Sequence, residues 1–430
     1  MKKIFLLPIL ASLLVACDYT YKEKVSYQIN EPVFMSEATF RNSVKITNKQ
    51  QEIRSYGKIC FYNGYLFISE SEVGIHILDN RNPAQPHNIG FIELLGNADI
   101  AIKGNKLYAD SYIDLVWFNI SDPANPRLEG RLENAFPEAF PIVENGYGCD
   151  YSMIYDENGN KRSGIVVGWT LKKRVEDVDK QSGGWWQRRP GLAEDGAYLA
   201  VNKSNSMSSG VNGSMSRFTL YDKYLYAVIN NQMVIFDLEV DTPKRVFADY
   251  LPYMSEVETI FSYKDKMFLG MPSGMTIYSV EDPLKPAYCS LIVHAYGCDP
   301  VVVDNDLAYI TVRSDNFCGQ TINELFVVDV SDVYHPKQIV SYAMTHPKGL
   351  GVDNGLLFVC DDGLKVFKIG EPQLLMANQI LHKKGMDGYD LIPYENVLMM
   401  ITDTGLYQYD YSDLNNIKEL SVIPILKVKS

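Results

Sequence analysis

The sequence predicts an all-β protein folded as a seven-bladed β-propeller. Its 430 residues are 46% hydrophobic and 12% aromatic, which is enough apolar material for a large core. Short apolar segments that follow turn residues recur about every 41 residues, the repeat length of a four-stranded propeller blade. Length alone would predict two or three domains, but a repeat this regular predicts a single domain built from similar units.

Each repeat contains an anchor residue in its predicted second strand. The residue eight positions before each anchor is always apolar, as a strand with one buried face requires. The repeats start near residues 57, 98, 216, 258, 299, 348 and 389, within a propeller domain that covers 33–430. The anchors are Phe67, Tyr108, Tyr226, Phe268, Tyr309, Phe358 and Met399.

The third strand of each repeat is an apolar run that usually ends on a polar residue, as at 75–79 and 325–329. A proline-containing turn follows several of these strands. Proline cannot donate to a β-ladder, so it ends the strand, and the polar residue is expected to cap the turn. We therefore assign Asp79, Asp237 and Asp329 a structural role rather than a catalytic one.

The N-terminus predicts export and lipidation. Two lysines precede an apolar stretch with the length and order of a signal peptide, residues 1–16, which is too short for a membrane span. The sequence Leu14-Val15-Ala16-Cys17 resembles a bacterial lipobox, in which Cys17 receives the lipid; an ordinary signal peptide with a coincidental cysteine is the alternative. Residues 17–32 are then the lipidated tether. We expect an exported protein anchored by lipid to the bacterial membrane. The periplasmic or surface face of the outer membrane is favoured, and the inner membrane is the alternative.

The third-strand pentapeptides and the Asp-Pro-x-x-Pro turns resemble those of the bacterial LVIVD-repeat propellers. The resemblance extends from about residue 57 to the C-terminus, and with the lipobox it resembles the lipoproteins of Bacteroidota that carry this module. That family has no assigned reaction. The resemblance therefore implies a fold and a location, and it transfers no catalytic residue.

One interval between anchors is long, because Tyr108 and Tyr226 are separated by one repeat plus an insertion at 134–211. Within it we predict a β-hairpin from about 150 to 170 and then a long loop. An eighth, degenerate blade is the alternative to this insertion between blades 2 and 3. The segment 33–46, before the first repeat, is expected to lie against the last blade and help to close the ring.

The insertion also contains a candidate binding loop. Trp185, Trp186, Arg188 and Arg189 follow two glycines. Tryptophan and arginine anchor protein interfaces, and tryptophan faces stack on sugar rings. In the alternative interpretation the loop folds over the propeller and buries its own tryptophans.

The repeats also place one charged residue at the start of every innermost strand. In a closed ring these side chains converge at one end of the central channel. They could form a polar pocket for a small ligand, a sugar or a metal; the alternative is a solvated channel mouth whose charges pair around the ring. These residues are Lys58, Asp99, Arg217, Glu258, Asp299, Lys348 and Asp390.

The cysteines and histidines show no metal-site spacing, and we predict neither a metal nor a cofactor. Cys298 and Cys318 both belong to the fifth repeat and are a candidate disulfide. Cys60 and Cys360 lie in predicted strands, where a buried thiol is the simplest expectation.

The charge balance excludes a nucleic-acid partner, because 53 acidic residues outnumber 40 basic ones. Two functions remain. The favoured hypothesis is a non-catalytic binding module or scaffold in the cell envelope, with a protein or glycan partner and no catalytic residue. The alternative is an envelope enzyme of the glycan hydrolase or lyase type. It would use paired acids at the channel mouth, such as Asp99, Glu258, Asp299 and Asp390.

Overall fold

The computed structural model describes residues 22–55, 57–136, 139–143, 146–179, 211–229, 231–251, 257–271, 273–293, 300–313 and 322–426. The chain divides into two compact units. The larger unit consists of Val33–Glu144, Ser163–Gly168 and Leu199–Ser430, and the smaller of Met1–Pro32, Asn145–Arg162 and Trp169–Tyr198.

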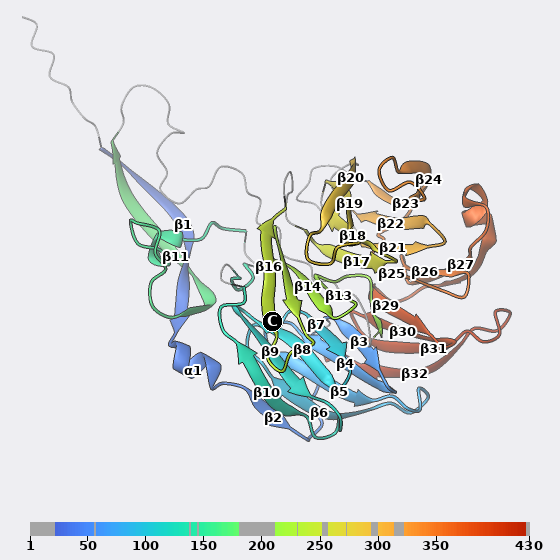
Figure 1. Ribbon diagram of the computed structural model, residues 1–430, viewed down its shortest axis with the longest axis horizontal. Coiled ribbons are helices and arrows are strands. Elements are labelled where there is room, and N and C mark those ends of the chain that lie inside the picture. Colours follow the sequence, from blue (N-terminus) through green and yellow to red (C-terminus); the bar gives the residue numbers. More distant parts are fainter. Residues whose placement is uncertain are drawn as a thin grey trace, which may run out of the picture. The chain divides into compact units, whose positions relative to one another are not determined.

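The larger unit contains seven antiparallel sheets, each built on four consecutive strands (Figure 1). This confirms the predicted seven-bladed propeller, and the described ranges contain no eighth four-stranded sheet. Blades 1 to 3 comprise β3 (Ile59–Tyr62), β4 (Tyr65–Glu70), β5 (Gly74–Asp79), β6 (His87–Glu93); β7 (Ile100–Lys103), β8 (Lys106–Ser111), β9 (Asp114–Asn119), β10 (Arg127–Leu132); and β13 (Phe218–Tyr221), β14 (Tyr224–Ile229), β15 (Gln232–Asp237), β16 (Lys244–Tyr250).

Blades 4 to 7 repeat the same order, and the first strand of each blade is the innermost. Blades 4 and 5 comprise β17 (Thr259–Tyr263), β18 (Lys266–Met271), β19 (Gly274–Ser279), β20 (Ala287–Val293); and β21 (Val301–Asp304), β22 (Leu307–Arg313), β23 (Asn323–Asp329), β24 (Lys337–Ala343). Blades 6 and 7 comprise β25 (Leu350–Asp353), β26 (Leu356–Cys360), β27 (Leu364–Lys368), β28 (Gln379–Lys383); and β29 (Gly388–Tyr394), β30 (Val397–Thr402), β31 (Gly405–Asp410), β32 (Lys418–Pro424). A 3-10 helix, η2 (Pro372–Asn378), precedes β28.

Tight turns join the first and second strands of the blades. In blade 1 the two turn residues, Asn63 and Gly64, have φ values of 48° and 78°; in blade 6, Asn354 and Gly355 have 47° and 73°. Positive φ at both positions is typical of the type I′ turn, whose backbone twist matches that of the two strands it joins. Asparagine and glycine tolerate this conformation best. This turn chemistry underlies the repeated sequence signal.

The turns after the third strands are capped as the sequence predicts. The backbone N–H of Glu239 donates to Asp237 Oδ1 at 2.9 Å, and that of Ser331 donates to Asp329 Oδ1 at 2.9 Å. A carboxylate that accepts from the amide two residues later forms a local turn that needs no other partner. These aspartates therefore stabilise the outer turns of the propeller.

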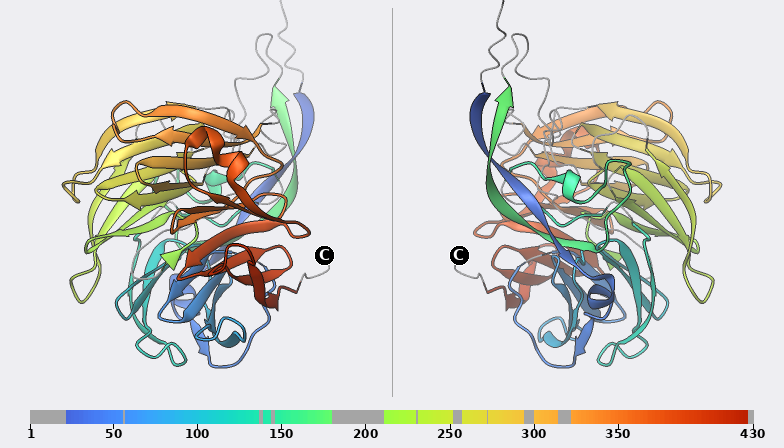
Figure 2. Two further views of the ribbon diagram at one scale, coloured as in Figure 1. Left: turned by 90° about the vertical axis from the view of Figure 1, so that its right-hand side faces the viewer. Right: turned by 90° about the vertical axis from the view of Figure 1, so that its left-hand side faces the viewer.

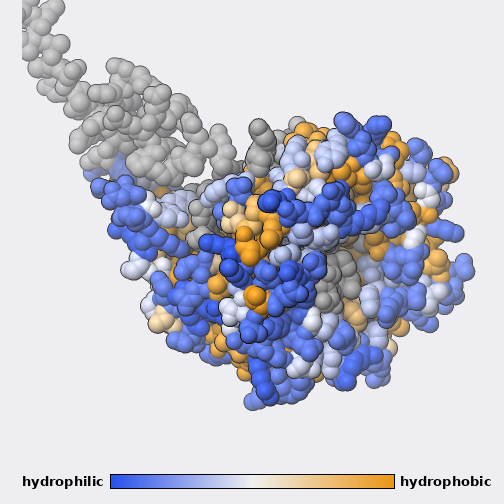
Figure 3. All heavy atoms as spheres, viewed as in Figure 1, coloured by the Kyte–Doolittle hydropathy of each residue, from blue (hydrophilic) through white to orange (hydrophobic). Residues whose placement is uncertain are grey.

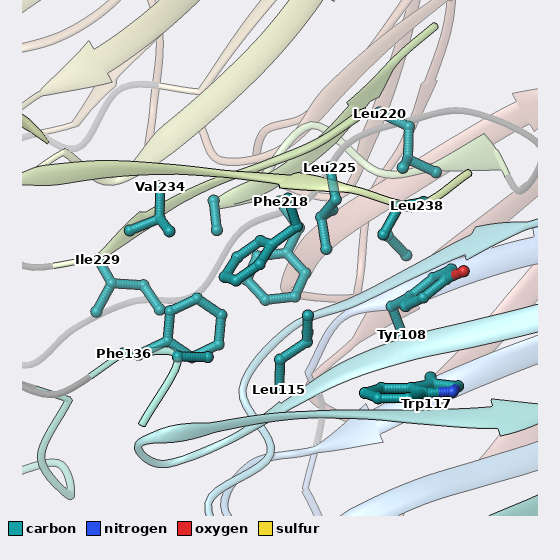
Figure 4. Close-up of a cluster of buried hydrophobic side chains, with 14 residues drawn as sticks. Tyr108, Leu115, Trp117, Phe136, Phe218, Leu220, Leu225, Ile229, Val234 and Leu238 are labelled. Atoms are coloured by element: carbon teal, nitrogen blue, oxygen red, sulfur yellow. The ribbon is translucent and has the colours of Figure 1, made fainter. Parts of the chain in front are cut away.

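Apolar side chains fill the space between neighbouring blades, as Figure 4 shows for blades 2 and 3. Phe136, from the first residues of the insertion, is 2% exposed and lies 5.5 Å from the ring of Phe236 and 5.9 Å from that of Phe218. The start of the insertion is therefore part of the core. Polar residues cover most of the face seen in Figure 3.

The ring closes between blades 1 and 7. The side-chain amides of Asn80 and Gln408 exchange two hydrogen bonds of 2.9 and 2.7 Å, and Leu426 N donates to Ile53 O at 2.8 Å. The prediction that 33–46 lies against the last blade is wrong. Instead, β2 (Lys45–Thr47) pairs with β6, the outer strand of blade 1, after the short helix α1 (Glu37–Arg41).

The predicted hairpin at 150–170 is also wrong. Residues 165–179 form one long strand, β11 (Ile165–Asp179), whose partner is β1 (Lys22–Met35), and the two run side by side in Figure 2. The described part of the expected tether is therefore strand from residue 22 onward. Residues 150–164, which precede β11, contain a 3-10 turn, η1 (Tyr151–Met153), and an isolated antiparallel β-bridge between Tyr155 and Lys161. Among the described residues, no helix is long and apolar enough to cross a bilayer.

Candidate functional site at the propeller axis

The structure describes six of the seven charged residues that the repeat register places at the inner strands; Asp299 lies outside the described residues. All six are buried, with exposed fractions between 0% for Lys58 and Asp390 and 9% for Arg217. Charged groups buried to this degree are costly unless they are paired or hydrogen-bonded. Their partners therefore decide what the channel can do.

The main partner is a stretch of the chain itself. After the insertion, β12 (Val211–Asn212) pairs with the inner edge of β3 in blade 1, with Asn212 opposite Cys60. Residues 213–216, which we call the central segment, then cross between the innermost strands to the start of blade 3. Every residue of the central segment is buried.

Blades 6 and 7 hold the first half of the central segment. Ser214 donates to Asp390 Oδ1 through its backbone N–H, at 2.9 Å, and through its hydroxyl, at 3.2 Å. The same hydroxyl oxygen accepts from Leu350 N at 2.9 Å. Asp390 thus binds a residue 176 positions away in the chain, across the axis of the ring.

Two glycines make room for the Asp390 carboxylate. A Cβ on Gly213 would lie 1.9 Å from Asp390 Oδ2, and one on Gly349 would lie 2.5 Å from Asp390 Oδ1. Real side-chain atoms do not approach this closely, so both positions require a residue without a Cβ. The carboxylate is packed directly against backbone on two sides.

Blades 1, 2 and 4 hold the second half. Lys58 Nζ donates to Met215 O, and the Ser216 hydroxyl donates to Asp99 Oδ1 at 3.0 Å. Arg217 N donates to Asp99 Oδ2 at 3.0 Å, and Ile260 N donates to Ser216 O at 2.5 Å. The central segment and Arg217 thus bond to inner strands, or to the residues just before them, in five of the seven blades.

Burial controls the protonation of the acids at the axis. It raises the pKa of Asp390 to about 6, against the opposing effect of Lys58 and the backbone amides that donate to this carboxyl. Burial also raises the pKa of Asp99, although Lys58 Nζ lies 3.9 Å from Asp99 Oδ2. The ammonium therefore offsets only part of the cost of removing these carboxylates from water.

The other three charged residues are Lys348, Glu258 and Arg217. Lys348 Nζ donates to Asp387 Oδ2 at 2.6 Å; Lys348 lies just before the first strand of blade 6, and Asp387 just before that of blade 7. Glu258 is 7% exposed, and the Arg217 side chain is 9% exposed with no hydrogen-bond partner for its Nε among the described residues. The structure thus gathers Lys58, Asp99 and Asp390 around the central segment, whereas Lys348 pairs with Asp387.

Comparison with known families agrees with this architecture. Residues 96–133 and 300–344, which span blades 2 and 5, match the family model of the LVIVD repeat. The chain is an LVIVD-repeat propeller. No curated protein matches the sequence.

Solved structures support the fold of this LVIVD-repeat propeller and nothing finer. A protein from Lactobacillus plantarum is 11% identical with a TM-score of 0.52, and the alignment covers 87% of this chain and 98% of that one. A candidate 6-phosphogluconolactonase from Bacteroides fragilis is 9% identical with a TM-score of 0.50, covering 86% and 96%. At this level of identity the similarity shows shared architecture.

One set of residues in the LVIVD-repeat propeller escaped the sequence interpretation. An acidic residue near the end of the second strand accepts backbone N–H groups from the segment that precedes the first strand. Asp110 Oδ1 accepts from Ala98 N at 2.6 Å and Asp99 N at 2.7 Å, and Asp361 Oδ1 accepts from His346 N at 2.6 Å. Burial raises the pKa of Asp110 to about 6. The recurrence of an acid at or next to the end of the second strand in repeats 1, 2 and 6 (Glu70, Asp110, Asp361) is the signal that could have revealed this set.

The remaining predicted site residues divide into two groups. Cys17, Trp185, Trp186, Arg188, Arg189, Cys298 and Cys318 lie outside the described residues. Cys60 and Cys360 are free, buried thiols, and burial raises the pKa of each well above its usual value. In the part of the chain that the structure describes, no group of three or more His, Cys, Asp or Glu residues is arranged to hold a metal.

Proposed function

We propose that this protein is an exported, lipid-anchored propeller that binds a protein or glycan of the cell envelope and catalyses no reaction. The observation that carries the proposal is the central segment. Asp99 and Asp390, the acids expected to act across the channel, are at most 1% exposed and accept hydrogen bonds from this segment. An acid–base pair must reach its substrate, and here the chain itself occupies that position.

The insertion is the best candidate for the binding element. It leaves the propeller after β10, the outer strand of blade 2, and returns through β12 at the innermost strand of blade 1. Both ends are fixed, by Phe136 in the core and by the pairing of Val211 and Asn212 with β3. A loop held at both ends loses less entropy on binding than a free one. This supports placing the partner on Trp185, Trp186, Arg188 and Arg189.

The partner is therefore expected to offer surfaces that suit tryptophan and arginine. A sugar ring stacks on the indole faces, and a protein surface offers a pocket for the indoles and carboxylates for the guanidinium groups. A chain with a net charge of −13 does not favour a strongly anionic partner such as nucleic acid.

Binding can be tested with the full-length, lipidated protein in its native cells. The double variant Trp185→Ala/Trp186→Ala is compared with Tyr288→Ala/Tyr334→Ala, which removes two aromatic residues that are 49% and 58% exposed on blades 4 and 5. In-cell crosslinking and a glycan array measure binding. We expect the first variant to lose at least ten-fold in binding and the control to match the unchanged protein.

Equal losses in the two variants, or none in either, would remove the insertion from the proposal. Turnover of any envelope glycan by the unchanged protein, abolished in Asp99→Asn, would favour the enzyme instead. The lipid is tested separately: Cys17→Ser should release the protein from the membrane fraction and stop incorporation of labelled fatty acid. Retention of the variant in the membrane would contradict the anchor.

A further inference from the structure

The first and last blades of the ring are each built from consecutive strands, so neither blade combines strands from both ends of the chain. Blade 1 takes its four strands from β3 to β6, and blade 7 takes its four from β29 to β32, close to the C-terminus. They meet through side chains, through the Asn80–Gln408 amide pair, and through one backbone hydrogen bond from Leu426 to Ile53. A ring of this kind holds together only as well as each junction between neighbours.

The central segment adds contacts of another kind, because it connects blades that are not neighbours. Ser214 bonds to blades 6 and 7, the Met215 carbonyl oxygen accepts from Lys58 before blade 1, and Ser216 bonds to blades 2 and 4. It continues directly into blade 3 through Arg217 and Phe218. A junction between two adjacent blades joins two blades, whereas the central segment bonds to five.

These contacts also satisfy groups that would otherwise be costly at the axis. Lys58, Asp99 and Asp390 are each at most 1% exposed, and the central segment replaces water at Lys58 Nζ, Asp99 Oδ1 and Asp390 Oδ1. Removing the segment would leave two carboxylates and an ammonium group in an apolar environment. The ring charges and the segment therefore depend on each other.

We infer that residues 213–216 close the propeller from the inside: the segment is an internal brace that locks blades 1, 2, 4, 6 and 7 to one another. The ring then opens only when the brace leaves the axis. Weakening the brace at one residue should loosen distant blades together. Weakening an ordinary junction should loosen only the blades on either side of it.

The test compares two buried serines, each of which makes hydrogen bonds through its hydroxyl. Ser214→Ala removes the hydroxyl that joins Asp390 to Leu350. Ser290→Ala removes the hydroxyl that donates to Val333 O at 2.6 Å, between blades 4 and 5, away from the central segment. Native-state hydrogen exchange of the full-length protein, read by mass spectrometry of peptides, measures opening of each innermost strand.

We expect Ser214→Ala to accelerate exchange at least ten-fold in the first strands of blades 1, 2, 4, 6 and 7 together. Ser290→Ala should accelerate it only in blades 4 and 5. Acceleration confined to blades 6 and 7 in Ser214→Ala would overturn the inference, since the Ser214 hydroxyl bonds to Asp390 and Leu350 in those two blades.

A second variant, Gly213→Ala, perturbs the central segment more strongly than the loss of one hydroxyl. Gly213→Ala places a methyl group 1.9 Å from Asp390 Oδ2 and forces the segment to move. The same distributed pattern of exchange is expected. A variant that exchanges like the unchanged protein, or only beside Asp390, would contradict the brace.

Discussion

Aspartates at the axis and at the rim of this propeller occupy repeated positions, yet they act in opposite ways. At the rim, Asp329 accepts from Ser331, two residues away. At the axis, Asp390 accepts from Ser214, 176 residues away, and Asp99 accepts from Ser216, 117 residues away. The same side chain shapes a turn in one place and joins remote parts of the chain in the other.

Protonation separates the two regions as well. At the rim, hydrogen bonds from Arg81 lower the pKa of Asp79 to about 2, and those from Ser331 lower the pKa of Asp329. At the axis, burial raises the pKa of Asp390 and Asp110 to about 6. Exposed carboxylates with local donors are stabilised when charged, whereas buried ones resist charge even when they accept several hydrogen bonds.

The largest effect should come from removing an axial acid. Asp390→Ala leaves the N–H and hydroxyl of Ser214 without their acceptor, while Lys58 keeps its pair with Asp99 at 3.9 Å. Deleting one partner from a buried charged network typically costs about 3–5 kcal/mol. Urea unfolding followed by circular dichroism should show this loss; a loss below about 1 kcal/mol would mean that water replaces the carboxylate.

A pH series should separate the axis from the rim. Asp390 binds a proton more tightly in the folded state, so its contribution to stability is full below its unfolded pKa of about 4 and is lost as pH rises through about 6. Two pKa units correspond to roughly 3 kcal/mol. In Asp390→Asn the change in unfolding free energy between pH 4 and pH 7 should shrink; an unchanged profile would assign it to other groups, such as Asp110.

Backbone space at the axis can be tested without removing any charge. Gly213→Ala should cost about 1–3 kcal/mol, the usual range for overpacking, because the added Cβ would lie 1.9 Å from Asp390 Oδ2 in a buried carboxylate. Gly355→Ala is the comparison, since nothing lies within 4 Å of its added Cβ and the strain comes only from a φ of 73°. Thermal unfolding should rank Gly213→Ala as the more destabilised; the reverse order would mean that the axis adapts.

The smallest effect should come from the rim. Asp329→Ala removes acceptors for the N–H and hydroxyl of Ser331, both of which can turn to water. A hydrogen bond of this type contributes about 1 kcal/mol or less. The midpoint of urea unfolding should fall far less than in Asp390→Ala; losses of similar size would erase the difference between the two regions.

Local sequence patterns predicted what local interactions determine. Positive-φ turns at Asn63-Gly64 and Asn354-Gly355, apolar third strands, and the capping aspartates each depend on residues within a few positions. Apolar strands recur in every blade and these turn residues in several, so the number of blades and the innermost position of Asp99 and Asp390 followed from the spacing. The hairpin at 150–170 failed because β11 pairs with β1, whose residues lie more than a hundred positions away.

By itself the sequence determined a ring of seven blades with charged residues at the start of its inner strands, because that information repeats along the chain. Only the tertiary structure decided what those charges do. The residues that bond to Lys58, Asp99 and Asp390 come from a short non-repeated stretch of glycine, serine and methionine at 213–216, whose composition alone resembles a flexible connector. Its buried position depends on hydrogen bonds to five blades at once. These contacts form only when the ring is assembled, so no repeated sequence pattern encodes them.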